Sequence, residues 1–168
     1  PNYIITSSIA APALLDLGVP LLVSHMFVFY FGILADLTPP VALACFAAAP
    51  IAGERGLKIS LWAVRIAMAG FVVPFMAVYA PALMLQESDL LGIVYIVVKA
   101  LFAIGLWGAA SIGHWRAPLT GYERLLALVA GATLIAALPL TDEIGFALGA
   151  LVVGWHLWRN RPTVTHEV

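Results

Sequence analysis

The stretch HMFVFYFGILADLTPPVALACFAAAPIAG, which runs from His25 to Gly53, decides the fold of this chain. It is a long apolar segment, interrupted near its middle by residues 36–40, which read Asp-Leu-Thr-Pro-Pro. Pro39 and Pro40 lack a backbone N–H, and each disfavours the α conformation in the residue before it. The sequence therefore predicts one discontinuous helix, made of two half-helices joined by an unwound pentapeptide.

The unwound pentapeptide has two interpretations. In lipid, a backbone polar group without a partner costs several kcal/mol, so a break at membrane depth is buried in protein or lines a cavity. Broken helices form the midplane substrate and ion sites of many secondary transporters. The alternative is a plain loop between two separate helices, and the residues alone leave both open. Asp36 leaves a similar choice, because its carboxylate either binds a cation or caps the first half-helix near water.

The composition indicates an integral membrane protein. Of the 168 residues, 63% are hydrophobic and only 10% are charged, against roughly 25% charged in soluble domains, and the mean hydropathy is +1.04. A net charge of −1 gives no reason to expect nucleic acid as a partner. Cys45 is the only cysteine, which excludes an intrachain disulfide. Pro1 does not resemble a natural N-terminus, so we expect this chain to be the C-terminal part of a longer one.

Residues 2–15 form the first apolar run, which is rich in small residues. As a helix it spans roughly 21 Å, short of the hydrocarbon thickness of roughly 30 Å, so we expect a re-entrant half-hairpin. A turn at 16–20 precedes the two half-helices, which we place at 21–35 and 41–52.

The next segment begins with a basic stretch. Arg55, Lys58 and Arg65 surround Trp62, a combination typical of an interfacial stretch on the cytoplasmic side. We expect a membrane span over 66–85 to follow, kinked by a proline near its middle.

Residues 90–112 form a full-length apolar span that holds Lys99 near its centre. A lysine at this depth either snorkels or pairs with another helix, which is the structural interpretation, or takes part directly in transport. The runs 125–140 and 144–158 follow as a tight helical hairpin, which Gly145 and Gly149 allow to pack closely.

The charged loops predict an orientation. Basic residues fall at 55–65, 114–124 and 159–161, whereas the connections at 86–89 and 141–143 are acidic. Because positive loops stay inside, this alternation predicts a cytoplasmic C-terminus, and we expect the last residues, Thr163 to Val168, to fray.

The sequence shows no set of residues for catalysis. The four histidines lack metal-ligand spacing, no serine, histidine and acid converge on one predicted membrane level, and no phosphate-binding loop is present. We therefore expect no enzyme and no organic cofactor. His25 is interpreted as an interfacial residue bonded to a neighbouring carbonyl, with a proton relay as the alternative.

The chain resembles the large membrane subunit of the TRAP transporters, the tripartite ATP-independent periplasmic family. The resemblance covers roughly residues 1–85 and rests on NYIITSSIAAPAL, the broken stretch at His25 to Gly53, and FVVPFMAVYAPALML. It is similar above all to the fused permeases that work with TAXI-type binding proteins. The resemblance implies an all-α, polytopic protein of the bacterial inner membrane.

The same resemblance implies a function and a site. The expected function is Na⁺-coupled import of a small organic acid, delivered by a periplasmic substrate-binding protein and moved by an elevator-like motion. We expect Na⁺ to bind to the carbonyls from Leu37 to Pro39 and to the Thr38 hydroxyl. We expect the half-helix that begins at Val41 to direct the positive end of its dipole at the substrate carboxylate. The resemblance also places Asn2 and Tyr3 just after a hairpin tip. The full set of expected site residues is Asn2, Tyr3, Asp36, Leu37, Thr38, Pro39 and Pro40.

The chain is expected to divide into three parts. Residues 1–56 belong to a transport domain, 57–85 form a kinked span with an interfacial start, and 86–168 form an accessory segment of three membrane helices. Half of the expected site is missing, so this chain is not expected to transport alone. A non-transporting membrane anchor or assembly subunit is the alternative function, with the break serving only packing. The sequence leaves open the acid transported, the ion stoichiometry and the oligomeric state.

Overall fold

The computed structural model describes residues 2–86, 89–136, 138 and 140–160, and the regular elements in this part of the chain are helices apart from one pair of two-residue strands. The predicted all-α class is confirmed. The elements in chain order are α1 (Asn2–Asp16), α2 (Leu21–Leu34), α3 (Leu43–Ala52), α4 (Gly56–Tyr79), the 3₁₀ turn η1 (Pro81–Met84), α5 (Leu90–Ile112), β1 (His114–Trp115), β2 (Ala117–Pro118), α6 (Gly121–Ile135) and α7 (Thr141–Arg159).

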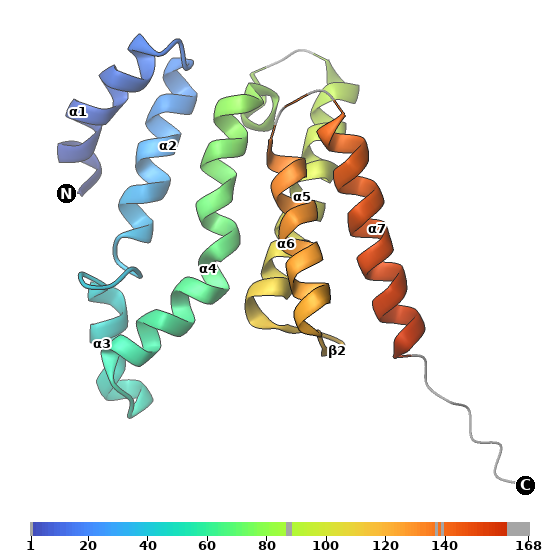
Figure 1. Cartoon of the computed structure of the whole chain (residues 1–168). Helices are drawn as coiled ribbons and strands as arrows, with labels where there is room; N and C mark the ends of the chain where they lie inside the picture. Colours follow the sequence, from blue (N-terminus) through green and yellow to red (C-terminus); the bar gives the residue numbers. More distant parts are fainter. Residues whose placement is uncertain (1, 87–88, 137, 139, 161–168) are drawn as a thin grey trace, which may run out of the picture.

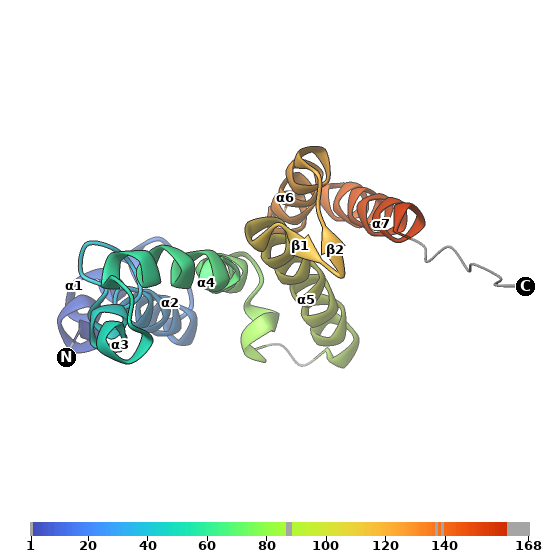
Figure 2. The ribbon, with the colours of Figure 1, turned by 90° about the horizontal axis from the view of Figure 1, so that it is seen from below.

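Helix α4 lies between two groups of helices. On one side are α1, α2 and α3, and on the other are α5, α6 and α7 (Figures 1 and 2). α4 packs against α2 and α3 and also against α5. On its α2 side the contact is aromatic, since Phe75 meets Phe27 and Phe31 at ring-centroid distances of 5.3 and 5.7 Å. The two groups are therefore joined through α4 and the short turn η1 that follows it.

Helices α4 to α7 alternate in direction, so their connections gather at two ends (Figure 1). The loop before α4, the β1–β2 hairpin and the end of α7 lie at one end, and these are the basic segments. Asp89, which precedes α5, and Asp142 and Glu143, in the first turn of α7, lie at the other end. The predicted separation of charge is thus present in space, and which end faces the cytoplasm stays a prediction.

Local sequence signals explain where several helices begin and end. Gly53 and Gly113 follow α3 and α5 with φ of +64° and +79°, the left-handed conformation that glycine adopts without strain. The Asp89 carboxylate accepts hydrogen bonds from two backbone N–H groups at the start of α5. Thr120 and Glu123 form a capping box at the start of α6.

Three predicted boundaries were wrong. α3 begins at Leu43 rather than Val41, because Ala42 is left-handed with φ of 39°. α4 is continuous from Gly56, so the interfacial stretch and the span form one helix, and this helix ends at Tyr79 because Pro81 starts a separate 3₁₀ turn.

The last hairpin also begins earlier than predicted. The capping box starts α6 at Gly121, and the helix ends at Ile135 instead of residue 140. α7 starts at Thr141. The antiparallel hairpin itself is confirmed, since α6 and α7 pack side by side along their length (Figure 1). The predicted frayed tail, 163–168, lies outside the described residues.

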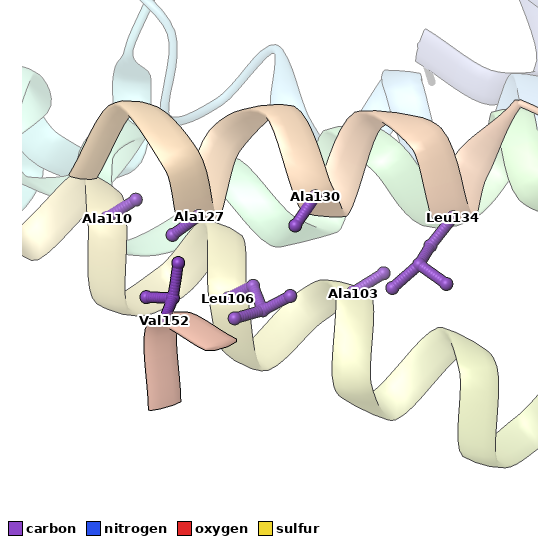
Figure 3. Packing of buried hydrophobic residues seen from close by; sticks show 7 residues of the cluster. All are labelled: Ala103, Leu106, Ala110, Ala127, Ala130, Leu134 and Val152. Atoms are coloured by element: carbon purple, nitrogen blue, oxygen red, sulfur yellow. The ribbon is translucent and has the colours of Figure 1, made fainter. Parts of the chain in front are cut away.

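Small side chains hold the α5–α7 group together. Its buried core consists mainly of alanines, with two leucines and one valine between them (Figure 3). Alanines let helices approach closely, which is how helices associate in lipid. The predicted close packing at Gly145 and Gly149 is confirmed. A Cβ at Gly145 would lie 2.6 Å from Leu134, and a Cβ at Gly149 would lie 2.5 Å from Phe102.

Among the residues that the structure describes, two helices, α4 and α5, are long and apolar enough to cross a membrane. Only 24% and 28% of their most apolar windows are buried inside the structure. A core helix of a soluble protein would be mostly covered, so these exposed apolar faces are typical of contact with lipid.

Candidate functional site

The backbone between α2 and α3 is a series of tight turns. The N–H groups of Asp36 and Leu37 donate to the carbonyls of Ile33 and Leu34, both at 3.1 Å. The N–H of Ala44, in the first turn of α3, donates back to the Asp36 carbonyl at 3.2 Å. These bonds satisfy several of the backbone groups that the end of a helix leaves free, and they fix α3 against the end of α2.

Thr38 lies inside this interruption and is half-buried. Its hydroxyl donates to the Leu34 carbonyl at 2.7 Å, and its own carbonyl accepts from the N–H of Ala42 at 3.0 Å. A hydroxyl that donates one hydrogen bond keeps its lone pairs for accepting. The Thr38 oxygen therefore retains the capacity to bind a cation while it caps α2.

Ser60 reaches the interruption from α4. Its side chain is fully buried, and its hydroxyl donates to the Leu37 carbonyl at 2.6 Å. The Cys45 thiol, from α3, lies 3.8 Å from the same oxygen. One carbonyl thus gathers contacts from two other helices. The sequence analysis did not single out Ser60; its only signal is a lone hydroxyl in the apolar second turn of α4.

The two prolines and Asp36 complete the interruption. Pro39 and Pro40 are joined by a cis peptide bond. The Asp36 carboxylate is partly exposed and makes no ion pair within the described part of the chain. The structure thus brings Asp36, Leu37, Thr38 and both prolines into one turn, as their adjacency requires.

Tyr3 contacts α2 above this turn. Its hydroxyl is hydrogen-bonded to Nδ1 of His25 at 2.8 Å, and its ring meets the edge of Phe29 at 5.9 Å between centroids. A Cβ at Gly32 would lie 3.9 Å from the Tyr3 nitrogen, so α1 starts beside the last turns of α2. His25 was expected to meet a carbonyl, and its partner is this phenol instead. The Asn2 side chain lies outside what the structure describes.

Lys99 lies far from the interruption. The structural interpretation of this lysine was that it either snorkels or pairs with another helix, and the structure shows a pair with another helix. Its ammonium is 2.6 Å from the Asp142 carboxylate of α7, and the Lys99 side chain is 6% exposed. The Tyr95 hydroxyl donates to the second oxygen of Asp142 at 2.7 Å. The charge is therefore neutralised within the α5–α7 group, which supports the structural interpretation.

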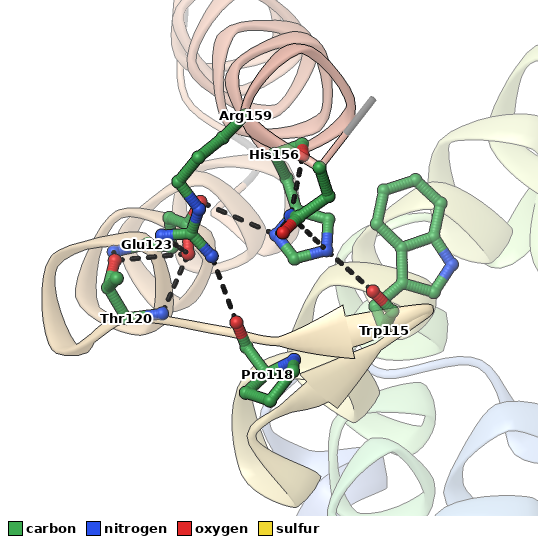
Figure 4. Close-up of polar contacts among 7 residues, drawn as sticks. Trp115, Pro118, Thr120, Glu123, His156 and Arg159 are labelled. Carbon is green, nitrogen blue, oxygen red and sulfur yellow. Dashed lines mark hydrogen bonds and ion pairs between the residues drawn. The ribbon is translucent and has the colours of Figure 1, made fainter. Parts of the chain in front are cut away.

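A second polar cluster ties the basic end of the same group together (Figure 4). The buried Glu123 carboxylate accepts from the Thr120 backbone at 2.7 Å and pairs with Arg159 at 3.1 Å. His156, which is also buried, lies 3.4 Å from Glu123 and 2.6 Å from the Trp115 carbonyl. The sequence analysis did not single out this cluster; the Thr-Gly-Tyr-Glu motif at 120–123 has the pattern of a capping box, but nothing in it indicates the contacts from α7.

The described residues contain no group of three or more histidine, cysteine or acidic side chains that could hold a metal. The oxygens available to a cation at the interruption are those of hydroxyls, carbonyls and the single Asp36 carboxylate, a ligand set that suits hard cations.

Two long apolar helices with largely uncovered faces, and a polar interruption between two short apolar helices, are typical of a membrane protein. A family model described as "Tripartite ATP-independent periplasmic transporter, DctM component" matches residues 1–89, more than half of the chain. The chain belongs to this family, which is a membrane transporter component and not an enzyme family. Comparisons with curated proteins and with solved structures give no match.

Proposed function

We propose that this chain is the C-terminal part of a fused, TAXI-type TRAP permease that imports a small organic acid together with Na⁺. A periplasmic binding protein delivers the acid, and the permease lies in the bacterial inner membrane with its C-terminus in the cytoplasm. The family match over residues 1–89 supports the transporter class. The separation of basic and acidic connections at opposite ends supports the orientation.

The observation that carries this proposal is the polar turn between α2 and α3. The Thr38 hydroxyl lies on the Leu34 carbonyl and the Ser60 hydroxyl on the Leu37 carbonyl, so this turn holds four oxygens in two hydrogen-bonded pairs among apolar helices. Oxygen ligands suit Na⁺, so Na⁺ binds here through the Thr38 hydroxyl and the carbonyls from Leu37 to Pro39. Asp36 and Pro40 border the ion, and the start of α3 directs its positive end at the substrate carboxylate. Asn2 and Tyr3 are included in the site on the family resemblance, and Tyr3 lies beside the last turns of α2.

The three parts of the chain have different roles in this proposal. Residues 1–56 belong to the moving transport domain, in which α1 is a re-entrant arm and α2 and α3 form one discontinuous helix. Residues 57–85 form the kinked span that follows, and 86–168 form an accessory membrane segment. The rest of the permease supplies the other half of the site.

Replacing Thr38 tests the ion site in the complete permease. Thr38→Val keeps the shape but removes an oxygen, so the Na⁺ concentration for half-maximal uptake should rise roughly tenfold, about 1.4 kcal/mol. Thr38→Ser keeps the hydroxyl and should leave the Na⁺ dependence close to that of the parent. Normal expression of Thr38→Val with an unchanged Na⁺ dependence would remove Thr38 from the site.

One observation favours the alternative, a non-transporting anchor. The Thr38 hydroxyl and the Leu37 carbonyl already have partners within the chain, as a purely structural turn requires. Proteoliposomes that hold the complete permease with its binding protein discriminate the two functions. A transporter gives Na⁺-dependent uptake of an organic acid, whereas an anchor gives none.

A further inference from the structure

The first turns of α4 form a basic groove on the surface. Arg55, Lys58, Trp62 and Arg65 are spaced three and four residues apart, so they share one face of the helix. Together with Leu57 and Leu61 they line a groove of about 350 Å³. We call this feature the basic groove.

The basic groove carries positive charge that the described residues do not neutralise. Lys58 pairs with Glu54, one turn earlier. Arg55 and Arg65 have no ion pair within the described residues, and the Arg65 guanidinium lies 4.9 Å from the centre of the Trp62 ring. This contact holds one cation over an aromatic face.

The groove is also apolar. Leu57, Leu61 and Trp62 are each exposed over about half of their surface, at 53%, 55% and 50%. Half-exposed apolar side chains beside unpaired cations suit a ligand that has both an anionic group and hydrocarbon.

The groove lies at the level where lipid headgroups are expected. It is at the basic end of the structure, where the β1–β2 hairpin and the last turn of α7 carry Trp115, Trp155 and Trp158. Tryptophans and cations concentrate at membrane–water interfaces. Figure 1 also shows that the first part of α4 runs obliquely before the helix turns towards its other end, as an interfacial segment does.

We propose that the basic groove binds the headgroup of an anionic phospholipid. The cations attract the phosphate, and arginine suits it because the guanidinium donates two parallel hydrogen bonds. The acyl chains of the same lipid cover Leu57, Leu61 and Trp62. A free phosphate ion would neutralise the cations but leave these apolar side chains uncovered, so a lipid fits both parts of the groove.

Lipid titration of the intact permease in detergent tests this site. Phosphatidylglycerol and phosphatidylcholine are added separately, and the bound lipid is counted by native mass spectrometry. A cation at a membrane surface contributes roughly a fivefold factor in affinity, so Arg55→Gln with Arg65→Gln should weaken phosphatidylglycerol binding roughly 25-fold. Binding of phosphatidylcholine should not change.

Arg116→Asn is the matched control, because Arg116 is exposed at the same end of the molecule but outside the groove. It should leave phosphatidylglycerol binding close to that of the parent. A loss of about fivefold in this variant, the same factor per cation as in the double variant, would show general attraction by surface charge and would overturn the proposal. Displacement of the lipid by inorganic phosphate at matched concentration would also overturn it, because the site would then be one for free anions.

Glu54→Gln provides a test in the opposite direction. It releases Lys58 from its ion pair, so phosphatidylglycerol binding should strengthen, up to about fivefold. A misfolded variant cannot produce this gain. Unchanged or weaker binding in Glu54→Gln would contradict the proposal.

Discussion

The family-matched part of the chain, residues 1–89, and the remainder, residues 90–168, hold their buried polar groups in different ways. In the first part, the buried or half-buried hydroxyls of Ser24, Thr38 and Ser60 donate to backbone carbonyls near helix ends. In the second part, buried charges pair across helices, at Lys99 and at Glu123. The one ion pair of the first part, within the described residues, is exposed.

This difference indicates what each part is built for. A hydroxyl on a carbonyl is a neutral bond of about 1 kcal/mol that another oxygen or a cation can replace. Breaking a buried ion pair leaves a charge in a low-dielectric environment and costs several times more. The polar contacts of the first part are therefore easier to exchange than the ion pairs of the second part.

The largest predicted effect is on the buried ion pair between Lys99 and Asp142. Asp142→Asn leaves Lys99 buried without a counter-charge, so we expect the permease to lose about 3 kcal/mol of stability. Thermal unfolding in detergent measures this loss. Glu143→Gln, the exposed neighbour in the same turn, is the control and should change little. If both variants unfold at the parent's temperature, the second part is not held by this pair.

The next effect comes from helix packing in the same part. Gly149→Ala places a methyl group against Phe102 and should cost roughly 1–3 kcal/mol by overpacking. Gly154→Ala, in the same helix, meets no atom within 4 Å and should be neutral or slightly stabilising. Thermal unfolding separates the two variants. A loss of stability in Gly154→Ala equal to that in Gly149→Ala would mean that close packing is not the cause.

A smaller effect is expected in the first part. Ser60→Ala removes the hydroxyl from the Leu37 carbonyl and should cost about 1–2 kcal/mol, since that oxygen keeps only a weak thiol contact. Ser8→Ala removes a hydroxyl that bonds within its own exposed turn and is the control. A loss for Ser60→Ala as large as that for Asp142→Asn would break the comparison between the two parts.

The smallest effect concerns the exposed pair in the first part. A hydrogen bond from Lys58 and its positive charge lower the pKa of Glu54 below the usual value of a glutamate. A lowered pKa in the folded state means that the pair stabilises the fold above the unfolded-state pKa. This contribution disappears as the pH falls through the lowered pKa. A carboxyl titration followed by NMR should show the pKa of Glu54 return to its usual value in Lys58→Met. An unchanged pKa would assign the shift to another cause.

Much of the fold could be predicted from local sequence signals. The bounds of α5 were predicted to the residue, because Asp89 and Gly113 mark its ends chemically. The two prolines also marked the non-helical segment between α2 and α3, while the interpretation of α2 and α3 as one discontinuous helix stays a prediction. Errors of several residues arose at α6, where the apolar run begins later than the helix, since the capping box rather than hydrophobicity determines its start.

The contacts within the candidate site were harder to predict. Ser60 donates to the Leu37 carbonyl, which is free because α2 ends three residues earlier, at Leu34. The sequence around Ser60 gives no indication of where α2 ends. Asp142 belongs to the acidic stretch 141–143, which was used to predict the orientation of the chain. That stretch gave no indication that Asp142 pairs with Lys99. Side chains that meet across helices depend on helix rotation, which periodicity alone does not determine in segments that are apolar on all sides.

The pair of Lys99 and Asp142 has a consequence for the order in which the chain assembles. The ribosome makes α5 before α7, so the Lys99 ammonium exists before its counter-charge has been synthesised. Until the α6–α7 hairpin arrives, α5 carries an uncompensated charge near its middle and is costly to hold in lipid. The last hairpin therefore completes the neutralisation of a helix made earlier, and a chain that stops after α6 leaves the Lys99 charge of α5 without its partner.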